Sequence, residues 1–551
     1  MRSSLTFGVA SLLLAGSAFA GDLNPPLGNP QPTNRVQINQ QTIGSFPYAI
    51  TESGSYVFTS DIVGVAGQHG ITIAVDNVTI DMNGFTLSGV VGSLTAIQPV
   101  GASAHFNLKV KNGNITQWDN FGVNFFNDDD CVVENVNVSN TGQDGFLMGE
   151  RARVINCSAS FTGEDGFELG SYSVVKDSAA NQCDETGFVV GIGTTIANST
   201  SRSNILDGFS MGVACTIDNS AAYNNGQDGI QTGTGSTVRG CSVRFNSGNG
   251  FFLSTHNTAV DCMSSQSGLD GVVAGDYSTL SNVSSTFAVN GFVVQDGVSL
   301  QNCTAGANDM DGFNGGVGCT ISNSSAMNNG DDGFEFLDNA NISNCTAQNS
   351  TDDGIKTDDN AVVTGCTVQG SGGEGIYVET ACVVSHSSSI ENGLNGIRTF
   401  GNTKVSHCTT RLNGSNGVGT SGSGLVTDTI AANNTGIGIN VSAAGTIINC
   451  KAYFNSGNGI QFGADSMVLN NHCDSNSGDA NFRGAGADGS RVEGNNATDG
   501  TRGFYITGSG AFIVCNTARD NTTNYDIAAG NDVGTFRATP AGADAWDNFN
   551  F

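Results

Sequence analysis

Residues 332–354 read DGFEFLDNANISNCTAQNSTDDG, and this stretch decides the fold. It runs from one Asp-Gly pair to the next, and the same spacing recurs along most of the chain. The repeat glycines are Gly145, Gly166, Gly187, Gly208, Gly229, Gly250, Gly271, Gly291, Gly312, Gly333, Gly354, Gly375, Gly396, Gly417, Gly438 and Gly459. Every step is 21 residues except one of 20, between Gly271 and Gly291. A fixed period of this length is typical of a solenoid, in which each repeat buries its apolar face against its neighbours.

Within each repeat, short apolar pieces alternate with Gly and Asn. Counted from the repeat glycine, position +1 is almost always apolar (Phe334) and position +9 nearly always aliphatic (Ile342). Position +12 is mostly Cys or Ser, as in Cys345, and position +14 is usually Ala or Ser, as in Ala347. Short pieces rich in β-branched residues and separated by turn residues indicate strands, and no segment shows competing helical spacing.

Three short strands per 21 residues predict one coil of a parallel β-helix. We therefore predict an all-β protein: a single right-handed parallel β-helix solenoid of about twenty coils, with an N-terminal cap. Equivalent positions should form columns along the axis. Asparagine recurs at +11, as in Asn344, and at +17, as in Asn225, where stacked amides can hydrogen-bond from coil to coil. No proline lies between Pro99 and Pro540, which suits strands that are paired on both sides.

Several motifs resemble those of a known family. Asn344–Ala347 and Asp332–Phe334, with Asn77–Phe85 and Asn524–Ile527, resemble an uncharacterised secreted bacterial group within the pectate-lyase-like superfamily. The resemblance covers roughly residues 40 to 535 and implies a right-handed parallel β-helix. It also implies a polysaccharide partner, because enzymes of this superfamily generally act on polysaccharides laid along an outer face. The marker motifs of its pectate lyases, polygalacturonases and alginate epimerases are missing here, so the resemblance is specific for fold and weak for function.

The two ends of the chain differ from the repeats. Arg2, the apolar run Leu5–Leu14 and the small residues around Ala20 predict a secretory signal peptide cleaved near Ala20. The mature protein is then expected to be secreted, periplasmic or at the cell surface, and no later segment predicts a membrane span. The predicted layout is a signal peptide (1–20), an extended lead-in (21–47), an N-terminal cap with the first coils (48–100), the β-helix repeats (101–527) and a C-terminal tail (528–551).

Charge excludes one class of partner. The chain carries 50 Asp and Glu against 20 Lys and Arg, a net charge of −30. Phosphate binding needs clustered cations, so we expect no nucleic-acid partner. The acidity suits a soluble rod, and it also leaves structural calcium open as a cofactor, since hard cations want several converging oxygens. The acidic pairs and triplets in question are Asp128–Asp130, Asp331–Asp332, Asp352–Asp353 and Asp358–Asp359.

Fifteen cysteines in a secreted chain would ordinarily suggest disulfides. Here most of them fall at position +12, where the other coils mostly have Ser, or at +7 in coils whose +12 residue is Ser. They therefore behave as small core residues. Only neighbours such as Cys241 and Cys262 stack directly, and parallel side chains do not readily give a relaxed disulfide dihedral. We expect most thiols to be free.

One outward patch differs from the bland coils around it. Position +2 alternates with the buried +1 and should face solvent. Four consecutive coils carry Glu335, Lys356, Tyr377 and Arg398 there. The following turns add further acids, namely Asp338, Asp358, Asp359 and Glu379. Such a set could bind an acidic sugar and transfer a proton; the alternative is a charge-complementary surface ladder of little energetic value.

If the patch is catalytic, its acting residues are Lys356, Tyr377 and Arg398. The two cations would orient a sugar acid, and Tyr377 would transfer the proton because neighbouring cations favour its ionised form. Glu335, Asp358, Asp359 and Glu379 would bind substrate. A second set, His386, His407 and Asp428 at position +11, could bind a metal, but these residues replace members of an asparagine column, which favours a turn role.

Two functions stay open. One is a carbohydrate-binding or carbohydrate-processing protein, of polysaccharide lyase or glycoside hydrolase type if it is an enzyme, that acts on extracellular polysaccharide through the Glu335–Arg398 patch. The other is a non-catalytic surface, adhesion or structural rod whose repeats supply length. The missing catalytic motifs favour the rod, whereas the concentration of polar residues on four otherwise bland coils favours carbohydrate interaction.

Overall fold

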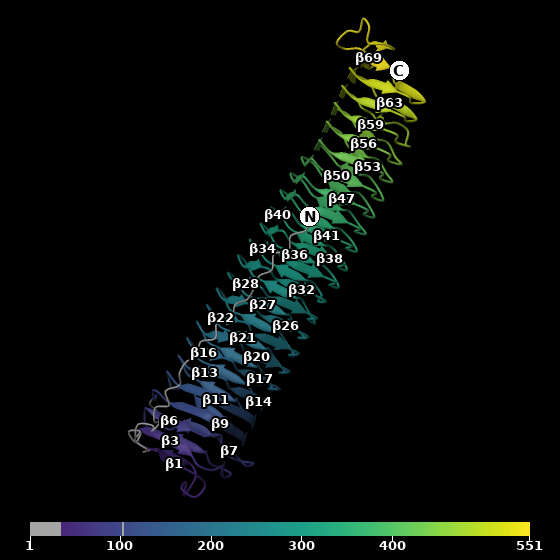
Figure 1. The fold of residues 1–551 in the computed structure, drawn as a ribbon. Helices are drawn as coiled ribbons and strands as arrows, with labels where there is room; N and C mark the ends of the chain where they lie inside the picture. Colours follow the sequence, from purple (N-terminus) through teal and green to yellow (C-terminus); the bar gives the residue numbers. More distant parts are fainter. Residues whose placement is uncertain (1–34, 102–103) are drawn as a thin grey trace, which may run out of the picture.

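The computed structural model describes residues 35–101 and 104–551, so the predicted signal peptide and the start of the lead-in lie outside it. The described residues form a long rod of stacked coils, with the first and last coils at opposite ends (Figure 1). The rod is a single right-handed parallel β-helix of about 24 turns, about 21 residues apart along the chain. The predicted fold is confirmed.

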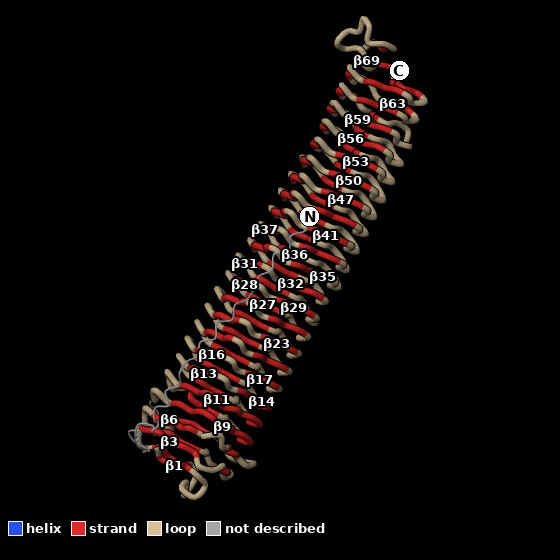
Figure 2. Tube along the Cα trace, in the orientation of Figure 1, coloured by secondary structure: helices blue, strands red, loops and turns tan. Residues whose placement is uncertain are grey.

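Each coil contributes three short strands. The coil that begins at Gly333 has β39 (Phe334–Phe336), β40 (Asn341–Ser343) and β41 (Thr346–Gln348). Every strand pairs in parallel with its equivalents in the coils before and after, so β39 lies between β36 (Phe313–Gly315) and β42 (Ile355–Thr357). Strands and loops alternate along the whole rod (Figure 2), and the described residues contain no helix that could cross a membrane.

Columns of apolar residues from equivalent positions fill the interior. At position +1, Phe146, Phe167, Phe188 and Phe209 are fully buried and stack with ring centroids 4.8, 4.6 and 4.9 Å apart. The first strand of each coil is typically buried at +1 and +3 and partly exposed at +2. The interior therefore holds the aromatic and aliphatic columns, while the +2 side chains form a row on the outside.

The two asparagine columns differ in location: one lies on the outside of a turn, and the other is buried. At +11, Asn156 has a φ of 52° and its amide donates to Asn135 Oδ1 at 2.8 Å on the outside of the turn. At +17 the amides are buried: Asn204 donates to Asn225 Oδ1, and Asn225 to Asn246 Oδ1, each at 3.0 Å. Asparagine tolerates the left-handed turn and supplies both a donor and an acceptor, which explains both columns.

The buried asparagine ladder is interrupted by Ser267 and Ala288 between Asn246 and Asn308, and a second time after Asn329. After Asn329 the next two coils carry Ser350 and Ser371, and asparagine returns at Asn392. The Nδ2 atom of Asn329 and the hydroxyls of both serines are buried without a hydrogen-bond partner. The two serines therefore leave three polar groups unsatisfied.

The cysteines pack as small core residues. All fifteen are free thiols, and fourteen are buried, with Cys515 partly exposed. The Sγ atom of Cys157 donates to the carbonyl oxygens of Ile155 and Val133. Burial raises the pKa of the Cys157 thiol to about 12, so this thiol is held protonated.

Strands also occur in the two segments that flank the repeats. In the lead-in, β1 (Val36–Ile38) pairs with β3 (Gly54–Phe58). In the C-terminal segment, β69 (Asn548–Asn550) pairs with β65 (Thr517–Arg519), and Trp546 packs edge-on against Phe512.

Candidate functional site

The predicted site residues lie on one side of four consecutive coils. At +2, Glu335 on β39 pairs with Lys356 on β42, which pairs with Tyr377 on β45 (Ile376–Val378), and that pairs with Arg398 on β48 (Ile397–Thr399). The turns that follow these strands hold Asp358, Asp359 and Glu379. We call the outward side of the first strands, together with the turn that follows each of them, the groove face.

The Lys356 ammonium is not free for a ligand. It lies 2.6 Å from Glu335 Oε1 and 3.2 Å from Asp332 Oδ2. Burial by itself would lower the Lys356 pKa, but the hydrogen bond that the ammonium donates to Glu335 and the charge of Asp332 raise the pKa above the ordinary lysine value. Lys356 is thus a paired cation rather than a base.

Arg398 has a similar arrangement. Its Nη1 atom lies 3.2 Å from Oε1 of Glu374, a carboxylate only 4% exposed. The same carboxylate accepts the backbone N–H of Asn395 at 2.6 Å and the Asn395 side-chain amide at 3.1 Å. The guanidinium also lies 5.4 Å from the ring centroid of Phe400. Arg398 therefore satisfies a buried acid with one part of its guanidinium and covers an aromatic ring with another.

The hypothesis that neighbouring cations favour the ionised form of Tyr377 is wrong. The phenol donates to Glu379 Oε1 at 2.5 Å. Burial and this acidic partner raise the Tyr377 pKa to about 12, and the opposing effect of Arg398 is smaller. The nearest charge is an anion rather than a cation, so the hydroxyl stays protonated at neutral pH and would not act as a base.

The two acids of the following turn point to different partners. Asp359 accepts both the backbone N–H and the hydroxyl of Thr380, and these bonds lower its pKa. For Asp358, burial and the neighbouring charges of Asp338 and Glu379 raise the pKa. The predicted residues are thus brought together, but as a network whose cations are already neutralised.

A ladder of carboxylates runs beside this row, at the position just before each repeat glycine. Each oxygen accepts the backbone N–H of the equivalent residue in the next coil, for example Asp332 from Asp353 at 2.8 Å. We call the carboxylates of this position the acid ladder: Asp144, Asp165, Asp207, Asp228, Asp270, Asp311, Asp332, Asp353 and Glu374. Most are nearly inaccessible, and Asp332 is 2% exposed. Burial raises the pKa of Asp332 to about 7. From the sequence, these residues were recognisable as the acids before the repeat glycines, and of them only Asp332 and Asp353 were singled out, as calcium candidates.

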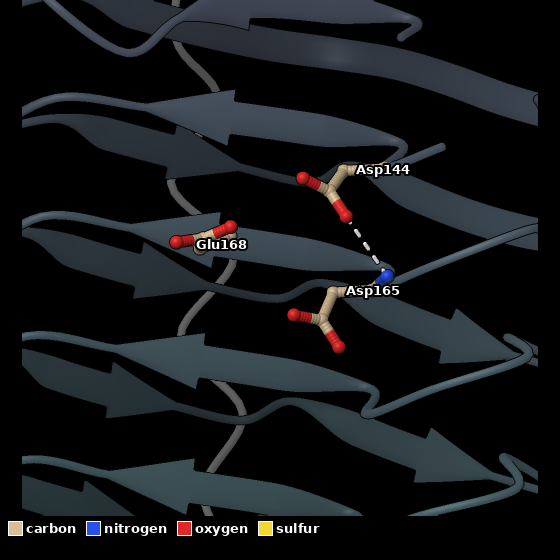
Figure 3. Close-up of side chains that lie close together, drawn as sticks. All are labelled: Asp144, Asp165 and Glu168. Atoms are coloured by element: carbon tan, nitrogen blue, oxygen red, sulfur yellow. Dashed lines mark hydrogen bonds between the residues drawn. The ribbon is translucent and has the colours of Figure 1, made fainter. Parts of the chain in front are cut away.

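The same arrangement of a carboxylate and a backbone N–H recurs near the start of the acid ladder. There, no Lys or Arg among the described residues pairs with the acids. Asp144 accepts the backbone N–H of Asp165 at 2.9 Å, and Glu168 on β15 (Phe167–Leu169) lies beside both carboxyl groups (Figure 3). Burial raises the pKa of Asp144 to about 8 and that of Asp165 to about 6, and it also raises the Glu168 pKa. Such a cluster holds protons near neutral pH.

The predicted metal positions have mixed outcomes. At the first, Arg151 contacts Asp129 and Asp130 at 3.0 Å each, so a side-chain cation already neutralises this pair. Among the described residues, three acidic groups have ligand atoms within 4.8 Å of one another: Asp144, Asp165 and Glu168; Asp311, Asp332 and Glu335; and Asp331, Asp332 and Asp352. The last group includes predicted calcium ligands, and calcium there stays a prediction.

The histidine set forms a stack rather than a chelate. The rings of His386 and His407 are parallel, with centroids 4.8 Å apart, and the His407 Nε2 atom lies 3.9 Å from Asp428 Oδ2. All three residues have positive φ, like the asparagines that they replace. This geometry is that of the turn role rather than of a metal site.

Two hollows open on the groove face. One, of about 580 Å³, is lined by residues that include Gln295, Asn314, Gly316 and Glu335, so it adjoins the predicted patch. The other, of about 420 Å³, lies where Gly149, Gly170 and Gly191 follow one another at position +4. Each hollow is lined by glycine at +4, where a Cβ would press against the preceding coil.

Sequence analysis overlooked an exposed tyrosine next to a lining residue of each hollow: Tyr172 follows Ser171, and Tyr277 follows Asp276. Tyr172 is 61% exposed and Tyr277 is 63% exposed, and both occupy position +6 in left-handed turns. Atoms of the Tyr172 ring lie 2.8 and 3.0 Å from an ideal Cβ built on Gly193, and the Tyr277 ring has the same relation to Gly297. Each ring therefore lies over a glycine of the next coil. The sequence did contain a signal for these tyrosines: each lies at +6 and is followed, 20 or 21 residues later, by a glycine at the same position.

Comparison with known proteins identifies the family. A family model described as a right-handed β-helix region matches residues 95–259, 272–434 and 354–485, which together cover more than half of the chain. No curated protein matches this chain.

Solved structures with a similar fold include three carbohydrate-active proteins. One is the catalytic domain of a GH87 α-1,3-glucanase in complex with nigerose, at 15% identity and a TM-score of 0.32, covering 56% of this chain and 66% of that one. A pectate lyase is 16% identical over 53% of this chain and 68% of its own, with a TM-score of 0.21. The A-module of a mannuronan C-5 epimerase from Azotobacter vinelandii is 12% identical over 84% and 91%, with a TM-score of 0.16. No activity is carried over to this chain from likenesses of this degree.

Proposed function

The chain belongs to the right-handed β-helix family, and from the surface of its own rod we propose that it binds extracellular polysaccharide along the groove face. The fold alone assigns no activity, because activity depends on the residues that a fold displays. The observation that carries the proposal is the pairing of each hollow with an exposed tyrosine, Tyr172 in one case and Tyr277 in the other.

An exposed aromatic ring held close to backbone suits a sugar. Each ring lies close to a glycine of the next coil, and more than half of each tyrosine is exposed and can receive the C–H bonds of a pyranose. The His256 ring packs against Tyr277, with ring centroids 5.5 Å apart. The hollow next to the ring gives the sugar room. Five coils separate the two tyrosines, about 24 Å at the spacing of paired strands, so a single extended chain could contact both.

The row of polar residues that begins at Glu335, next to the hollow of about 580 Å³, extends the same surface. Glu335 lines that hollow and begins the row that ends at Arg398. The rings of Tyr377 and Phe400 lie with their centroids 5.6 Å apart, and the carboxylates around them accept hydrogen bonds. Coils follow one another at about 4.8 Å, which is comparable to the length of one sugar unit. A polysaccharide that follows the rod therefore meets similar groups at each step.

The charge of this face favours a neutral glycan over an acidic one. Lys356 and Arg398 are paired with carboxylates, and the surrounding turns add Asp338, Asp358 and Glu379 without further cations. An acidic sugar would meet net negative charge. Hydroxyl groups, by contrast, can donate to these carboxylates, and such charge-assisted hydrogen bonds are among the stronger ones.

Binding without turnover fits the protonation of the patch. A general base must be able to take a proton near neutral pH. Tyr377 is protonated and donates to Glu379, and Lys356 is a charged, paired ammonium. The predicted catalytic trio is thus better suited to holding a ligand. Secretion to the periplasm, the cell surface or the medium, after cleavage near Ala20, remains part of this proposal and agrees with an extracellular ligand.

The test is affinity electrophoresis of the mature protein through gels that contain neutral glucans, xylan, mannan or a polyuronate. We expect a neutral polysaccharide to retard the protein, with about tenfold weaker affinity for Tyr172→Ala/Tyr277→Ala, because two stacking contacts are lost. The matched control is Tyr453→Ala, since Tyr453 lies on a third strand, β56 (Lys451–Tyr453), away from the groove face. If no polysaccharide retards the wild type, or if the double variant is retarded equally, the groove-face proposal fails and the alternative of a non-catalytic rod prevails.

A further inference from the structure

A second surface differs in charge from the rest of this acidic rod. It is the outward side of the third strands, at positions +13 and +15, between β17 (Ala179–Asn181) and β56. No Asp or Glu occupies these positions over that span. The charged residues there are all basic: Arg202, Arg244, Arg411 and Lys451. We call this surface the arginine face.

Two of these arginines flank a tyrosine in consecutive coils. Arg202 on β20 (Thr200–Arg202), Tyr223 on β23 (Ala221–Tyr223) and Arg244 on β26 (Ser242–Arg244) are in register. The Arg202 Cζ atom lies 5.6 Å from the centre of the Tyr223 ring, which is 41% exposed. Phe245 meets that ring edge-on at 5.4 Å and carries the Arg244 guanidinium at 4.6 Å.

Neither guanidinium has an acidic partner among the residues that the structure describes. Arg244 donates to the neutral Gln266 Oε1 at 3.0 and 3.1 Å, and the Arg202 guanidinium lies over the Tyr223 ring. By contrast, Lys356 and Arg398 are each bound to a nearly buried carboxylate. The chain as a whole has a net charge of −30, but these two neighbouring cations are not neutralised by acids. The local positive charge can therefore attract an external anion.

We propose that Arg202, Tyr223, Arg244 and Phe245 form a binding site for an anionic saccharide, held through its carboxylate or sulfate groups. Two strand spacings, about 10 Å, separate the arginines, and the tyrosine ring lies between them. A sugar ring on Tyr223 places acidic substituents within reach of one or both guanidiniums, which bind oxyanions through paired N–H groups. Phe245 packs against Arg244 from one side and so limits the positions of its guanidinium.

The local chemistry favours a saccharide over other polyanions. Two arginines cannot neutralise a nucleic-acid backbone, whose affinity depends on many phosphate contacts. Around the arginines, the outward residues are small and hydroxylic, such as Thr200 and Ser242, which suits hydrogen bonding to sugar hydroxyls. The site does not rest on the groove-face proposal, because it lies on other strands and selects an anionic rather than a neutral ligand.

Titration calorimetry at low salt tests the site with three hexasaccharides: a homo-uronate, a sulfated one and an uncharged one. We expect one or both anionic ligands to bind and the uncharged ligand not to use this site; which anion binds identifies the oxyanion. Arg202→Ala and Arg244→Ala should each weaken binding about tenfold, as expected for loss of a charge-assisted contact. Arg202→Lys should recover only part of the affinity, because lysine lacks the planar fork.

The matched control is Arg411→Ala. Arg411 is exposed at the same repeat position of the same face, but its strand neighbours are Ile390 and Ala432 rather than aromatic residues. Its loss should change affinity less than twofold, and Tyr172→Ala/Tyr277→Ala should leave anion binding intact. The proposal is overturned if neither anion binds, if Arg202→Ala/Arg244→Ala binds like the wild type, or if Arg411→Ala weakens binding as much, which would indicate unspecific attraction.

Discussion

Asp144 accepts the backbone N–H of Asp165 at 2.9 Å, so two successive carboxylates of the acid ladder are joined through the main chain and held beside Glu168. Backbone donors satisfy one oxygen of each acid but do not offset the loss of water around it. Burial therefore dominates, and it raises the pKa of Asp144 to about 8 and that of Asp165 to about 6.

This relationship predicts that the rod loses stability as pH rises. An unfolded aspartate ionises near pH 4, whereas Asp144, Asp165 and Asp332 ionise in the folded protein at about 8, 6 and 7. The unfolded chain therefore releases these protons first. The stability that they contribute is complete below about pH 4 and is lost as pH rises through 6 to 8. The melting temperature, measured by calorimetry from pH 4 to 9, should fall across that range.

Asp144→Asn should reduce this pH dependence and raise stability at pH 8 by on the order of 2 kcal/mol, because a neutral amide needs no proton. Asn249 already occupies the same position in another coil, where its Oδ1 accepts the Asp270 N–H at 3.2 Å. Asp359→Asn is the control with the opposite sign, since hydrogen bonds from Thr380 lower the Asp359 pKa. A melting temperature that is flat with pH would contradict the proton-holding role of the ladder.

Repair of the buried asparagine ladder should stabilise the rod. Ser350→Asn/Ser371→Asn would restore donors and acceptors between Asn329 and Asn392, and it should add about 1 kcal/mol for each restored bond, as a net gain in denaturant unfolding. Ser350→Ala is the control, because it removes a hydroxyl that has no partner and should change stability little. Destabilisation by the double variant would mean that water or another group already fills the gap.

The aromatic column should not tolerate charge. Phe334 is fully buried and stacks on Phe313 with ring centroids 4.9 Å apart. Phe334→Asp places an unpaired carboxylate there and should cost several kcal/mol in denaturant unfolding. Phe334→Ile is milder because isoleucine occupies this column naturally at Ile355. Equal melting temperatures for Phe334→Asp and the wild type would show that the side chain is not in the column.

Removal of the patch cations should affect stability more than binding. Lys356→Ala leaves Asp332, and Arg398→Ala leaves Glu374, as nearly buried acids without a cation. Each variant should lose about 1–3 kcal/mol at pH 8. Affinity for a neutral polysaccharide should change less than twofold, because these cations are already neutralised. A loss of affinity greater than tenfold, with unchanged melting, would show instead that these cations contact the ligand directly.

Thiol reactivity should follow burial. In the folded protein a disulfide reagent should reach Cys515, which is the partly exposed one, and the remaining fourteen should react only after unfolding. The count is made by absorbance of the released thiolate before and after addition of denaturant. More than half of the thiols should react in denaturant without reductant. Few reactive thiols under those conditions would indicate disulfides.

The fold could be predicted from the sequence because a 21-residue repeat is compatible with few folds. Phe334, Asn344 and Cys345 could each be assigned to a column, since the same residue type returns every 21 positions. Their partners could not be assigned. Tyr377 was expected beside cations along its row, but its hydroxyl turns to Glu379, two residues away on its own chain. Register predicts which side chains are neighbours; rotamers and burial decide which atoms meet.

The groove-face tyrosines and the acid ladder were missed for a different reason. Tyr172 matters because of a glycine in the next coil and a hollow beside it, and neither relation lies within one repeat. Asp144 could be recognised as the acid before a repeat glycine, but its raised pKa follows from burial, which the repeat pattern does not reveal. Properties that arise between coils were therefore the hardest to predict.

The ladder of strands has a consequence for how the length of this protein can change. Because β39 pairs only with β36 and β42, and the same holds for each equivalent strand of the described repeats, every coil is an interchangeable module. Deletion of one whole period, such as residues 208–228, would bring Gly187 and Gly229 into adjacent coils with every column still in phase. The rod would shorten by about 4.8 Å for each period removed. Duplication and loss of single modules could thus set the reach of the molecule without a new core having to be found.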